Sequence, residues 1–251
     1  MIKTVTSHLT RRLFDLPLPS DIYEHACERG VRPMLDGKRR DRLRAVRDAG
    51  ALFIHVPKNA GMSISNALYG RQIKHATVRY YARVAPDLLG ALPSFAILRD
   101  PVARFVSAYH FAQAGGSSHS RVSVPFRAPY MALRSIDAAL DHVEQAASPY
   151  QVNHIFRPQS WYVCGVDGAV AVDRLFAFED MDSVAVYLRD HGIAALARLN
   201  EGERDKQVVS AAQVDRLRIL YARDFEMFEE FSTRSCNAVD DLHWSGTGRI
   251  W

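Results

Sequence analysis

One segment near residue 55 constrains the fold more than any other part of this chain. It reads ALFIHVPKNAGMSISNAL over residues 51–68, an apolar stretch that runs into PKNAG and then into a helix-like stretch. This order predicts a strand, a loop and a helix. Because the loop N–H groups and the helix N-terminus would point at one spot, the segment favours binding of phosphate or sulfate. Lys58 precedes Gly61, whereas a nucleotide-triphosphate loop has its lysine after the second glycine, so this is not a Walker A sequence.

A second segment predicts another anion site at the end of a strand. SFAILRDPVARFVSAYHFAQ, over residues 94–113, contains a short apolar strand, a helix start at Asp100 and a helix that carries Ser107. Arg99 follows the strand directly. Ligands bind at the carboxyl ends of strands in open α/β sheets, so we expect Arg99 and Ser107 to converge there. Two anion sites on neighbouring strand ends indicate one ligand with two anionic groups.

Together these residues resemble the sulfotransferases that use 3'-phosphoadenosine 5'-phosphosulfate (PAPS). VPKNAGMSI is similar to the 5'-phosphosulfate loop of that family and LRDPVARFVSAYHF to its 3'-phosphate element, most of all in the carbohydrate-type branch, family 2. RPQ at residues 157–159, VDRLFAFEDM at 172–181 and LYARDFEMF at 220–228 fit the same branch in order and spacing. The resemblance spans roughly residues 51–231. Met62 departs from it, because the family usually has a hydroxyl residue there.

The resemblance implies a fold and a domain division. Strands that end in ligand loops and alternate with helices favour a three-layer α/β sandwich with a mainly parallel central sheet. The resemblance makes this the sulfotransferase version of the P-loop NTPase-like fold. Residues 51–251 are expected to form the sulfotransferase domain, with residues 1–50 as a lead-in of unknown role that packs on it.

Weaker patterns predict the remaining elements. A Gly/Ser-rich stretch over residues 115–128 predicts a long loop, either a lid over the acceptor or an ordinary surface loop. Periodicity and capping signals predict helices over residues 77–92, 135–147, 180–191 and 210–231, and a strand over residues 174–179.

Sulfuryl transfer, which the resemblance implies, needs a positive group at the leaving phosphate and a base at the acceptor. In an in-line displacement, negative charge grows on the leaving oxygen, so positioning and electrostatic stabilisation supply most of the acceleration. Lys58 is the candidate for this role, because its mobile cation can follow the charge. It is assisted by N–H groups of the loop, which also form the expected cofactor contacts: Asn59, Ala60, Gly61, Met62 and Ser63.

Three residues of the second segment are candidates for binding the 3'-phosphate. Arg99 and Ser107 match the ligands of that phosphate in the family, and an arginine fork on it would distinguish PAPS from ATP. Arg104 lies one turn before Ser107 and either joins them or pairs with a carboxylate such as Asp100.

His75 is the first candidate for the base. It lies in KHATVRYY, between two expected helices, and the resemblance implies a histidine at this connection. Histidine titrates near neutrality and is a frequent general base. The rivals are His110 and His119, and Glu179 is either a further base or a residue that orders the site.

Other polar residues receive smaller roles. His55 lies on the first strand and is expected to make a hydrogen bond in the core, while Gln159 and Asn200 are candidates for acceptor contacts. We expect no metal, because no residues have the spacing of a zinc site. Magnesium would be expected if the chain were a kinase.

Composition bounds the setting in which the protein works. The three cysteines, Cys27, Cys164 and Cys236, are far apart, which favours neither a disulfide framework nor a metal site and indicates a reducing compartment. No signal-peptide core and no run of about 18 apolar residues is present. We therefore expect a cytoplasmic enzyme of bacterial type. A chain from which an anchor has been removed is the alternative, and peripheral contact with a membrane stays open.

Three functions compete on these observations. The first is sulfuryl transfer from PAPS to a hydroxyl acceptor, on a saccharide or glycolipid. The second is a nucleotide-dependent kinase on a related scaffold, which the position of Lys58 disfavours. The third is a non-catalytic protein that binds an anionic polymer. The net charge of +4 comes from 32 basic and 28 acidic residues without a long run of like charges, so we expect no nucleic acid as a partner.

Overall fold

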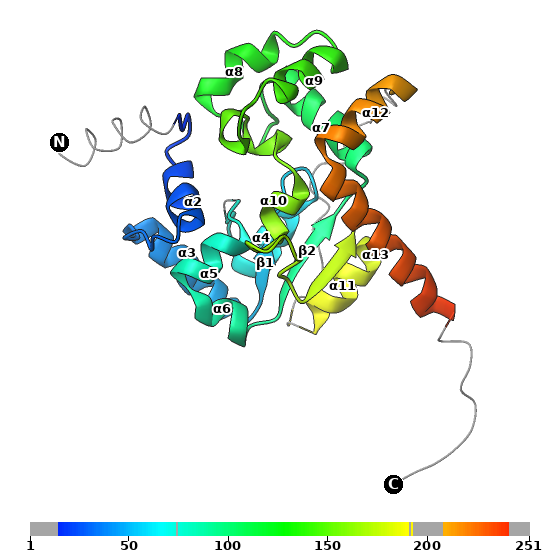
Figure 1. Cartoon of the computed structure of the whole chain (residues 1–251). Coiled ribbons are helices and arrows are strands. Elements are labelled where there is room, and N and C mark those ends of the chain that lie inside the picture. Colours follow the sequence, from blue (N-terminus) through cyan, green and yellow to red (C-terminus); the bar gives the residue numbers. More distant parts are fainter. Residues whose placement is uncertain (1–14, 74, 191, 193–207, 241–251) are drawn as a thin grey trace, which may run out of the picture.

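A small parallel sheet forms the centre of the protein in this computed structural model (Figure 1). Its strands β1 (Leu52–Ile54), β2 (Ser94–Leu98) and β3 (Arg174–Ala177) lie in the order β1-β2-β3, and both neighbouring pairs are parallel. Every residue of β1 and β2 is buried. Because side chains alternate between the faces of a sheet, helices must cover both faces. The prediction of a layered α/β fold with a parallel sheet is confirmed.

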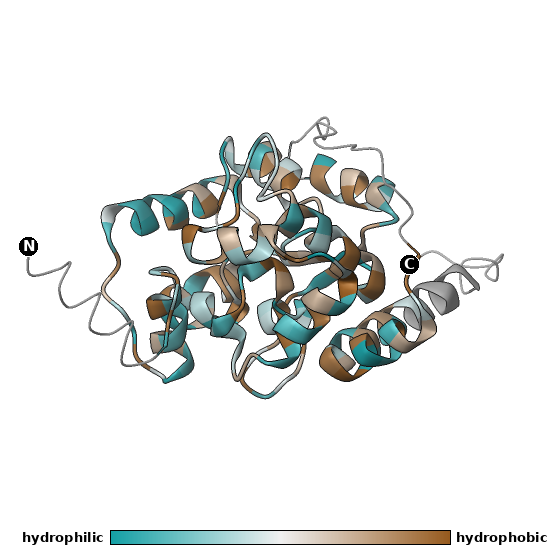
Figure 2. Cartoon of the chain, turned by 90° about the horizontal axis from the view of Figure 1, so that it is seen from above, coloured by the Kyte–Doolittle hydropathy of each residue, from teal (hydrophilic) through white to brown (hydrophobic). Residues whose placement is uncertain are grey.

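Helices form most of the rest of the structure, which describes residues 15–73, 75–190, 192 and 208–240. Seen from above, hydrophilic and hydrophobic residues alternate along many of them, as in helices that pack one side on a core (Figure 2). Their bounds are α2 (Asp21–Glu28), α3 (Gly37–Ala49), α4 (Gly61–Tyr69), α5 (Val78–Val84), α6 (Pro86–Ala91), α7 (Pro101–Gln113), α8 (Val124–Met131), α9 (Ile136–Glu144), α10 (Gln159–Val163), α11 (Met181–Arg189), α12 (Ala211–Leu220) and α13 (Ala222–Asp240), with the 3-10 turns η1 (Pro149–Gln151) and η2 (His154–Phe156).

Two hydrophobic clusters hold these elements together. The first surrounds the sheet and contains residues of α3, α4, α5 and α11. The second contains Phe105 and Tyr109 of α7 together with Tyr130 of α8 and Leu217 of α12. In Figure 1, α7, α8, α9 and α12 lie above the sheet, on the side where the chain leaves β2. The helix α7 therefore connects the carboxyl edge of the sheet to a second core.

Two of the expected long helices are interrupted. The helix predicted over residues 77–92 is divided into α5 and α6 at Ala85–Pro86, because proline has no N–H and disfavours helical backbone in the residue before it. The helix predicted over residues 210–231 begins at the expected capping box of Ser210 and Gln213 but is divided at Tyr221. There the Tyr221 hydroxyl donates to the Phe156 carbonyl at 2.7 Å, an interaction with a distant segment that no local pattern reveals.

The long loop expected over residues 115–128 is also wrong in part. Residues 115–122 form a tight hairpin, with the Val122 N–H donating to the Gly115 carbonyl, and α8 begins at Val124. By contrast, the helix expected over 135–147, the strand over 174–179 and the start of a helix at Asp180 are confirmed by α9, β3 and α11.

The helix α2 is anchored to the rest of the protein by buried carboxylates. Asp21 forms an ion pair with Arg157 at 2.6 Å, and both side chains are completely buried. Glu24 accepts hydrogen bonds from the N–H and hydroxyl of Thr77 at 3.1 and 2.7 Å. Burial raises the pKa of Glu24 to about 7, and those two hydrogen bonds oppose the rise. These bonds thus join α2 to two segments that come later in the chain, one before α5 and one before α10.

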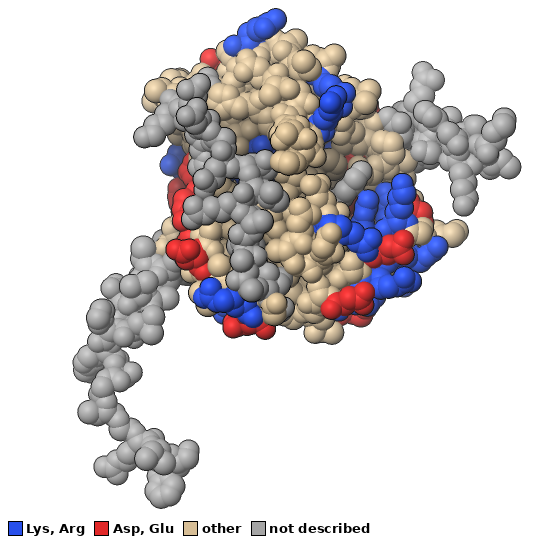
Figure 3. Space-filling model, turned by 180° about the vertical axis from the view of Figure 1, so that it is seen from behind, with Lys and Arg blue, Asp and Glu red and all other residues tan. Residues whose placement is uncertain are grey.

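Basic side chains of α3 form ion pairs with acidic residues. Arg39 pairs with Asp36 at 2.5 Å and Arg47 pairs with Asp87 at 2.8 Å. Figure 3 shows Lys and Arg side chains on this side of the molecule with Asp and Glu side chains among them. Such a surface does not present the continuous positive field that favours a nucleic-acid strand. Among the described helices, none is long and apolar enough to cross a membrane.

We predict that Asp21→Ala strongly destabilises the fold. The substitution leaves the Arg157 guanidinium buried without its carboxylate, which costs about 3–5 kcal/mol. Urea unfolding measures this loss. Asp41→Ala is the matched control, because Asp41 and its partner Arg44 are exposed and such pairs contribute about 1 kcal/mol or less. Equal stability of the two variants would contradict the anchoring role of Asp21.

Candidate active site

The loop between β1 and α4 has the backbone of an anion site. Lys58 and Ala60 have φ angles of 74° and 56°, in the left-handed region that non-glycine residues rarely adopt. The N–H groups of Ser63 and Ile64 donate to the Ala60 carbonyl. Within the described part of the chain, no backbone carbonyl forms a well-aligned hydrogen bond with the N–H groups of Asn59 through Met62. These donors, at the start of a helix, form a concave site suited to an anion.

Gly61 is required by the packing beneath this loop. A Cβ at Gly61 would lie 1.9 Å from Cδ2 of the His55 ring. His55 is itself buried and held, because its Nδ1 hydrogen-bonds the Ile73 carbonyl at 3.2 Å. Burial lowers the pKa of His55 to about 4, so the ring is neutral. The expected core hydrogen bond of His55 is confirmed, and the ring also determines how closely the loop approaches the strand.

The Lys58 side chain extends along α7. Its Nζ lies 4.2 Å from the centre of the Phe111 ring, a cation–π contact. Burial, followed by repulsion from Arg99 and Arg104, lowers the pKa of Lys58 to about 8. No carboxylate of the described residues forms an ion pair with Lys58. An anionic ligand would therefore relieve the repulsion among these cations.

Arg99 lies at the end of β2, beside the loop. Its guanidinium donates to the Lys58 carbonyl at 3.4 Å and lies 4.5 Å from the centre of the Phe178 ring. Phe178 directly follows β3, and its N–H donates to the Leu98 carbonyl at 2.6 Å. The register of the sheet, in which Leu98 pairs with Ala177, thus sets Arg99 and Phe178 side by side.

Arg104 holds the backbone around the site. It is buried, and its guanidinium donates to the carbonyls of Pro57, Ile155 and Arg157 at 2.6–3.3 Å. Asp100 instead accepts from the Ala103 N–H at 2.7 Å and caps α7. The expected pair of Arg104 with Asp100 is therefore wrong, because each side chain is used by backbone groups.

Ser107 is half-buried on the face of α7 that points at the loop. Arg104, Ser107 and Phe111 are spaced by three and four residues, so they share one helix face. Arg104 contacts the Pro57 carbonyl and Phe111 contacts Lys58, which places the intervening Ser107 opposite the same loop. The two segments singled out in the sequence therefore face each other.

Gln159 links the loop after β1 to the end of β2 through hydrogen bonds. Its Oε1 accepts from the Asn59 amide at 2.7 Å and from the Arg99 N–H at 3.0 Å, and its Nε2 donates to the Arg99 carbonyl at 2.8 Å. The side chain is completely buried. The structure does not support the expected acceptor contact of Gln159, because its side chain is completely buried and is held by these three bonds. Asn200, the other residue proposed for acceptor contact, lies outside the described residues.

His75 lies beside the loop, against His55. Its Nδ1 hydrogen-bonds the His55 carbonyl at 3.1 Å, and the two ring centres are 4.1 Å apart. Because a carbonyl oxygen only accepts, we assign the hydrogen to Nδ1, which leaves the lone pair of the neutral ring on Nε2. The His154 and Tyr162 rings lie 5.6 and 6.3 Å from the His75 ring. This is the tautomer that a base acting through Nε2 needs.

The rival bases lie in different surroundings. The Nε2 atom of His110 is buried without a hydrogen-bond partner among the described residues, and its ring packs beside Tyr109. His119 is exposed at the tip of the hairpin that follows α7, and Glu179 is exposed after β3. Of the four candidates, His75 is the one that contacts the strand leading into the anion loop.

Comparison with known families decides the identity. A family model described as "Sulfotransferase family" matches residues 41–232, which is more than half of the chain. The chain belongs to the sulfotransferase family. Its match is to family 2, in agreement with the resemblance drawn from the sequence. Searches of the curated proteins and of the solved structures return no significant match.

The residues of this sulfotransferase fit a ligand with two anionic groups. Loop N–H donors and Lys58 lie at one position, Arg99 lies beside it at the end of β2, and Ser107 lies on the α7 face that carries Arg104 and Phe111. This donor set is positive and rich in N–H groups, as phosphate and sulfate require. Within the described part of the chain, no group of His, Cys, Asp and Glu side chains could hold a metal ion.

Several residues that shape the sulfotransferase site were not predicted from the sequence. Phe178 packs under Arg99, Asp224 accepts from the N–H groups of Gln159 and Ser160 at 2.7 and 2.8 Å, and Asp21 pairs with Arg157. Phe178 and Asp224 fall inside segments that resemble the family, which was the one available clue. Asp21 lies outside the family match, so nothing local indicated its role.

We predict that Gly61→Ala destabilises the sulfotransferase by about 1–3 kcal/mol, the usual cost of overpacking, because its Cβ would overlap the His55 ring. Gly37→Ala is the control, since a Cβ at Gly37 meets nothing within 4 Å. Urea unfolding of both variants gives the comparison. If the overlap is the cause, the double variant His55→Ala/Gly61→Ala loses less stability than the two single losses added together. Strict additivity would contradict this explanation.

Proposed function

We propose that this sulfotransferase transfers a sulfuryl group from PAPS to a hydroxyl acceptor on a saccharide or glycolipid. One observation supports the donor above all others: Lys58 with its open loop donors lies next to Arg99, two positive positions joined by the bond from Arg99 to the Lys58 carbonyl. PAPS has a 5'-phosphosulfate and a 3'-phosphate, which suit two such positions. Bound PAPS would supply the sulfuryl group and a phosphate leaving group.

Lys58 serves the leaving group in this proposal. Its cation rests on the Phe111 ring in the structure, and the long side chain can turn from there toward the loop donors. The N–H groups of Asn59, Ala60, Gly61 and Met62 hold the 5'-phosphosulfate, and Ser63 contributes from the first turn of α4. Because these donors are fixed before binding, they stabilise developing charge with little reorganisation. Arg99 and Ser107 hold the 3'-phosphate.

His75 serves the acceptor. With its hydrogen on Nδ1 and bonded to the His55 carbonyl, the ring presents Nε2 to take the proton of the acceptor hydroxyl. The attacking oxygen then displaces the leaving phosphate in line. In the structure His75 contacts the His55 carbonyl, next to β1, and Lys58 contacts Phe111 of α7.

The other functions have weaker support. A kinase would need carboxylates for magnesium, and the described residues beside the loop contribute cations and amides instead. Binding of an anionic polymer would not require the loop after β1 and one face of α7 to converge. We place the enzyme in a reducing compartment such as the bacterial cytoplasm, since Cys27 and Cys164 are buried free thiols. Burial raises the pKa of Cys27 to about 12, so that thiol is unreactive.

The donor is tested by ligand-dependent thermal stability. Adenosine 3',5'-bisphosphate (PAP) at about 100 times its dissociation constant should add roughly 2.7 kcal/mol, or several degrees of midpoint. The comparison ligands are 5'-AMP and ATP with magnesium, which should do less. Arg99→Ala should remove the preference for PAP over 5'-AMP, while the exposed Arg134→Ala should keep it. A response confined to ATP with magnesium would instead establish the kinase.

PAP affinity should fall as pH rises through about 8. The anion binds the protonated form of Lys58, and its lowered pKa means that the free enzyme loses this proton near pH 8 rather than near 10.5. Affinity is therefore full at pH 7 and roughly tenfold weaker at pH 9. Lys58→Arg should remove the dependence, because arginine stays protonated throughout. Titration calorimetry at both pH values measures it, and an equal slope in the two proteins would exclude Lys58 as the titrating group.

His75→Ala should reduce turnover by roughly 100- to 10,000-fold, the range for loss of a general base, and leave PAP affinity nearly unchanged. His119→Ala is the matched control, because His119 is exposed on the hairpin and should retain full turnover. The measurement uses labelled PAPS with a mixture of saccharide acceptors. Normal turnover of His75→Ala would assign the base to another residue.

A further inference from the structure

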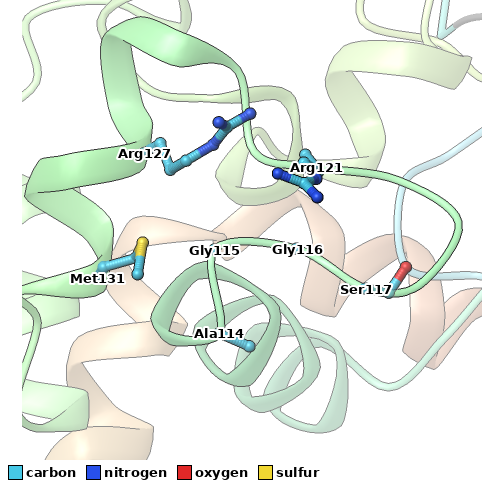
Figure 4. Close-up of a pocket in the computed structure, with 7 residues that line it drawn as sticks. All are labelled: Ala114, Gly115, Gly116, Ser117, Arg121, Arg127 and Met131. Atoms are coloured by element: carbon cyan, nitrogen blue, oxygen red, sulfur yellow. The ribbon is translucent and has the colours of Figure 1, made fainter.

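A cavity with a volume of about 300 Å³ lies at the far end of α7 (Figure 4). Its walls come from the end of α7, from the hairpin that follows and from α8. The residues that line it are Ala114, Gly115, Gly116, Ser117, Arg121, Arg127 and Met131. None of them belongs to the proposed donor site. The cavity is at the small end of the range for ligand pockets, which suits one ring of a saccharide better than a nucleotide.

Backbone hydrogen bonds hold the hairpin that forms one wall of the cavity. Gly116 and Arg121 form an antiparallel bridge, and the Ser117 N–H donates to the Ser120 carbonyl at 2.6 Å. Gly116 has a φ angle of 135°, and a Cβ there would lie 2.4 Å from the Ser120 oxygen. Glycine is therefore required at this turn. The tight turn sets the position from which the Arg121 side chain extends.

Two arginines dominate the charge of the cavity. Arg127 extends from α8 and Arg121 from the hairpin, and Figure 4 shows their side chains reaching toward each other. The Arg127 Nε donates to the Val122 carbonyl at 3.1 Å, which orients its guanidinium. The seven lining residues include no Asp or Glu, and no ion pair joins either arginine to a carboxylate of the described residues.

Several other surface arginines of this protein are paired with carboxylates. Arg216, for example, pairs with Asp137, Asp141 and Glu144 at 2.5–3.1 Å. Two guanidinium groups at one cavity without a carboxylate repel each other, and an anion between them would convert that repulsion into attraction. Guanidinium forks bind carboxylate and sulfate groups through paired hydrogen bonds. The cavity is therefore complementary to a small anionic group.

The position of the cavity connects it to the proposed reaction. Phe111, whose ring contacts the Lys58 ammonium, lies in the last turn of α7, three residues before its C-cap Ala114. The Gly116 N–H donates to the Phe111 carbonyl at 2.9 Å, so the hairpin begins directly against that residue. A ligand in the cavity would thus lie a short distance along α7 from the group that meets the leaving phosphate.

We propose that this cavity binds an anionic substituent of the acceptor, a carboxylate or a sulfate ester on a neighbouring sugar ring. The proposal rests on the proposed function, because a saccharide acceptor is assumed. In it, Arg121 and Arg127 select charged saccharides over neutral ones and hold the chain beside the reacting hydroxyl. They determine specificity and take no part in bond formation.

Titration calorimetry in low salt with saturating PAP tests this site. The probes are a hexasaccharide of alternating glucuronate and N-acetylglucosamine, its carboxyl-reduced neutral form, and the neutral form with sulfate esters added. The charged probes should bind roughly tenfold or more tightly than the neutral one, since a hydrogen bond to a charged group contributes about 1.5–3 kcal/mol. The tighter of the two charged probes identifies the substituent as carboxylate or sulfate.

Variants assign the binding to the cavity. Arg121→Gln and Arg127→Gln should each weaken the charged probe roughly fivefold to tenfold and leave the neutral probe and PAP unchanged. Arg134→Gln removes the same charge from an exposed position that does not line the cavity, and should change binding by less than about twofold. Unliganded melting midpoints show that the variants are folded.

The outcomes separate this proposal from the proposed function. Equal binding of charged and neutral probes, or equal effects of Arg121→Gln and Arg134→Gln, would overturn the anionic site. No binding of any hexasaccharide by a protein that binds PAP would overturn it as well, and the proposed donor would stand. Arginine-dependent binding of a charged probe without any PAP response would support the cavity and overturn the donor.

Discussion

The site depends on the hydrogen bonds of the Gln159 side-chain amide. This amide hydrogen-bonds the Asn59 side chain in the loop after β1 and both backbone groups of Arg99 at the end of β2. All of these groups are buried, and each one left without a partner would cost about 1–3 kcal/mol. The two segments proposed to hold PAPS therefore keep one relative position, and such preorganised donors are what electrostatic catalysis requires.

Gln159 is itself held by distant parts of the chain. Asp224 of α13 accepts from its N–H, and burial raises the pKa of that carboxyl while the Arg104 charge and these hydrogen bonds oppose the rise. Asp21 of α2 pairs with Arg157, two residues before Gln159. Elements near both ends of the described chain thus each hold the segment that carries Gln159. This explains why α2, which precedes the family match, is packed with buried charge.

Two cations of the site contact aromatic rings. Lys58 rests on Phe111 and Arg99 on Phe178. A carboxylate partner would compete with an anionic ligand, whereas a ring holds the cation and leaves its charge available. The cost is repulsion among Lys58, Arg99 and Arg104, which contributes to the lowered pKa of Lys58. Repulsion of this kind costs stability, and such a cost is common at functional sites.

The sequence by itself determined the features that depend on neighbouring residues. The apolar runs of β1 and β2, the loop with Lys58 and Gly61, and the caps at Asp100, Ser135 and Ser210 form through contacts a few residues apart, and all were predictable. Only the tertiary structure decided the interruption at Tyr221, the roles of Gln159, Phe178 and Asp21, and the meeting of Arg121 with Arg127 at one cavity. Apart from the cavity, these features depend on partners 60 or more residues away in the sequence; Asp21 and Arg157, for example, are 136 residues apart. The periodicity of one segment carries no information about which distant segment will pack against it.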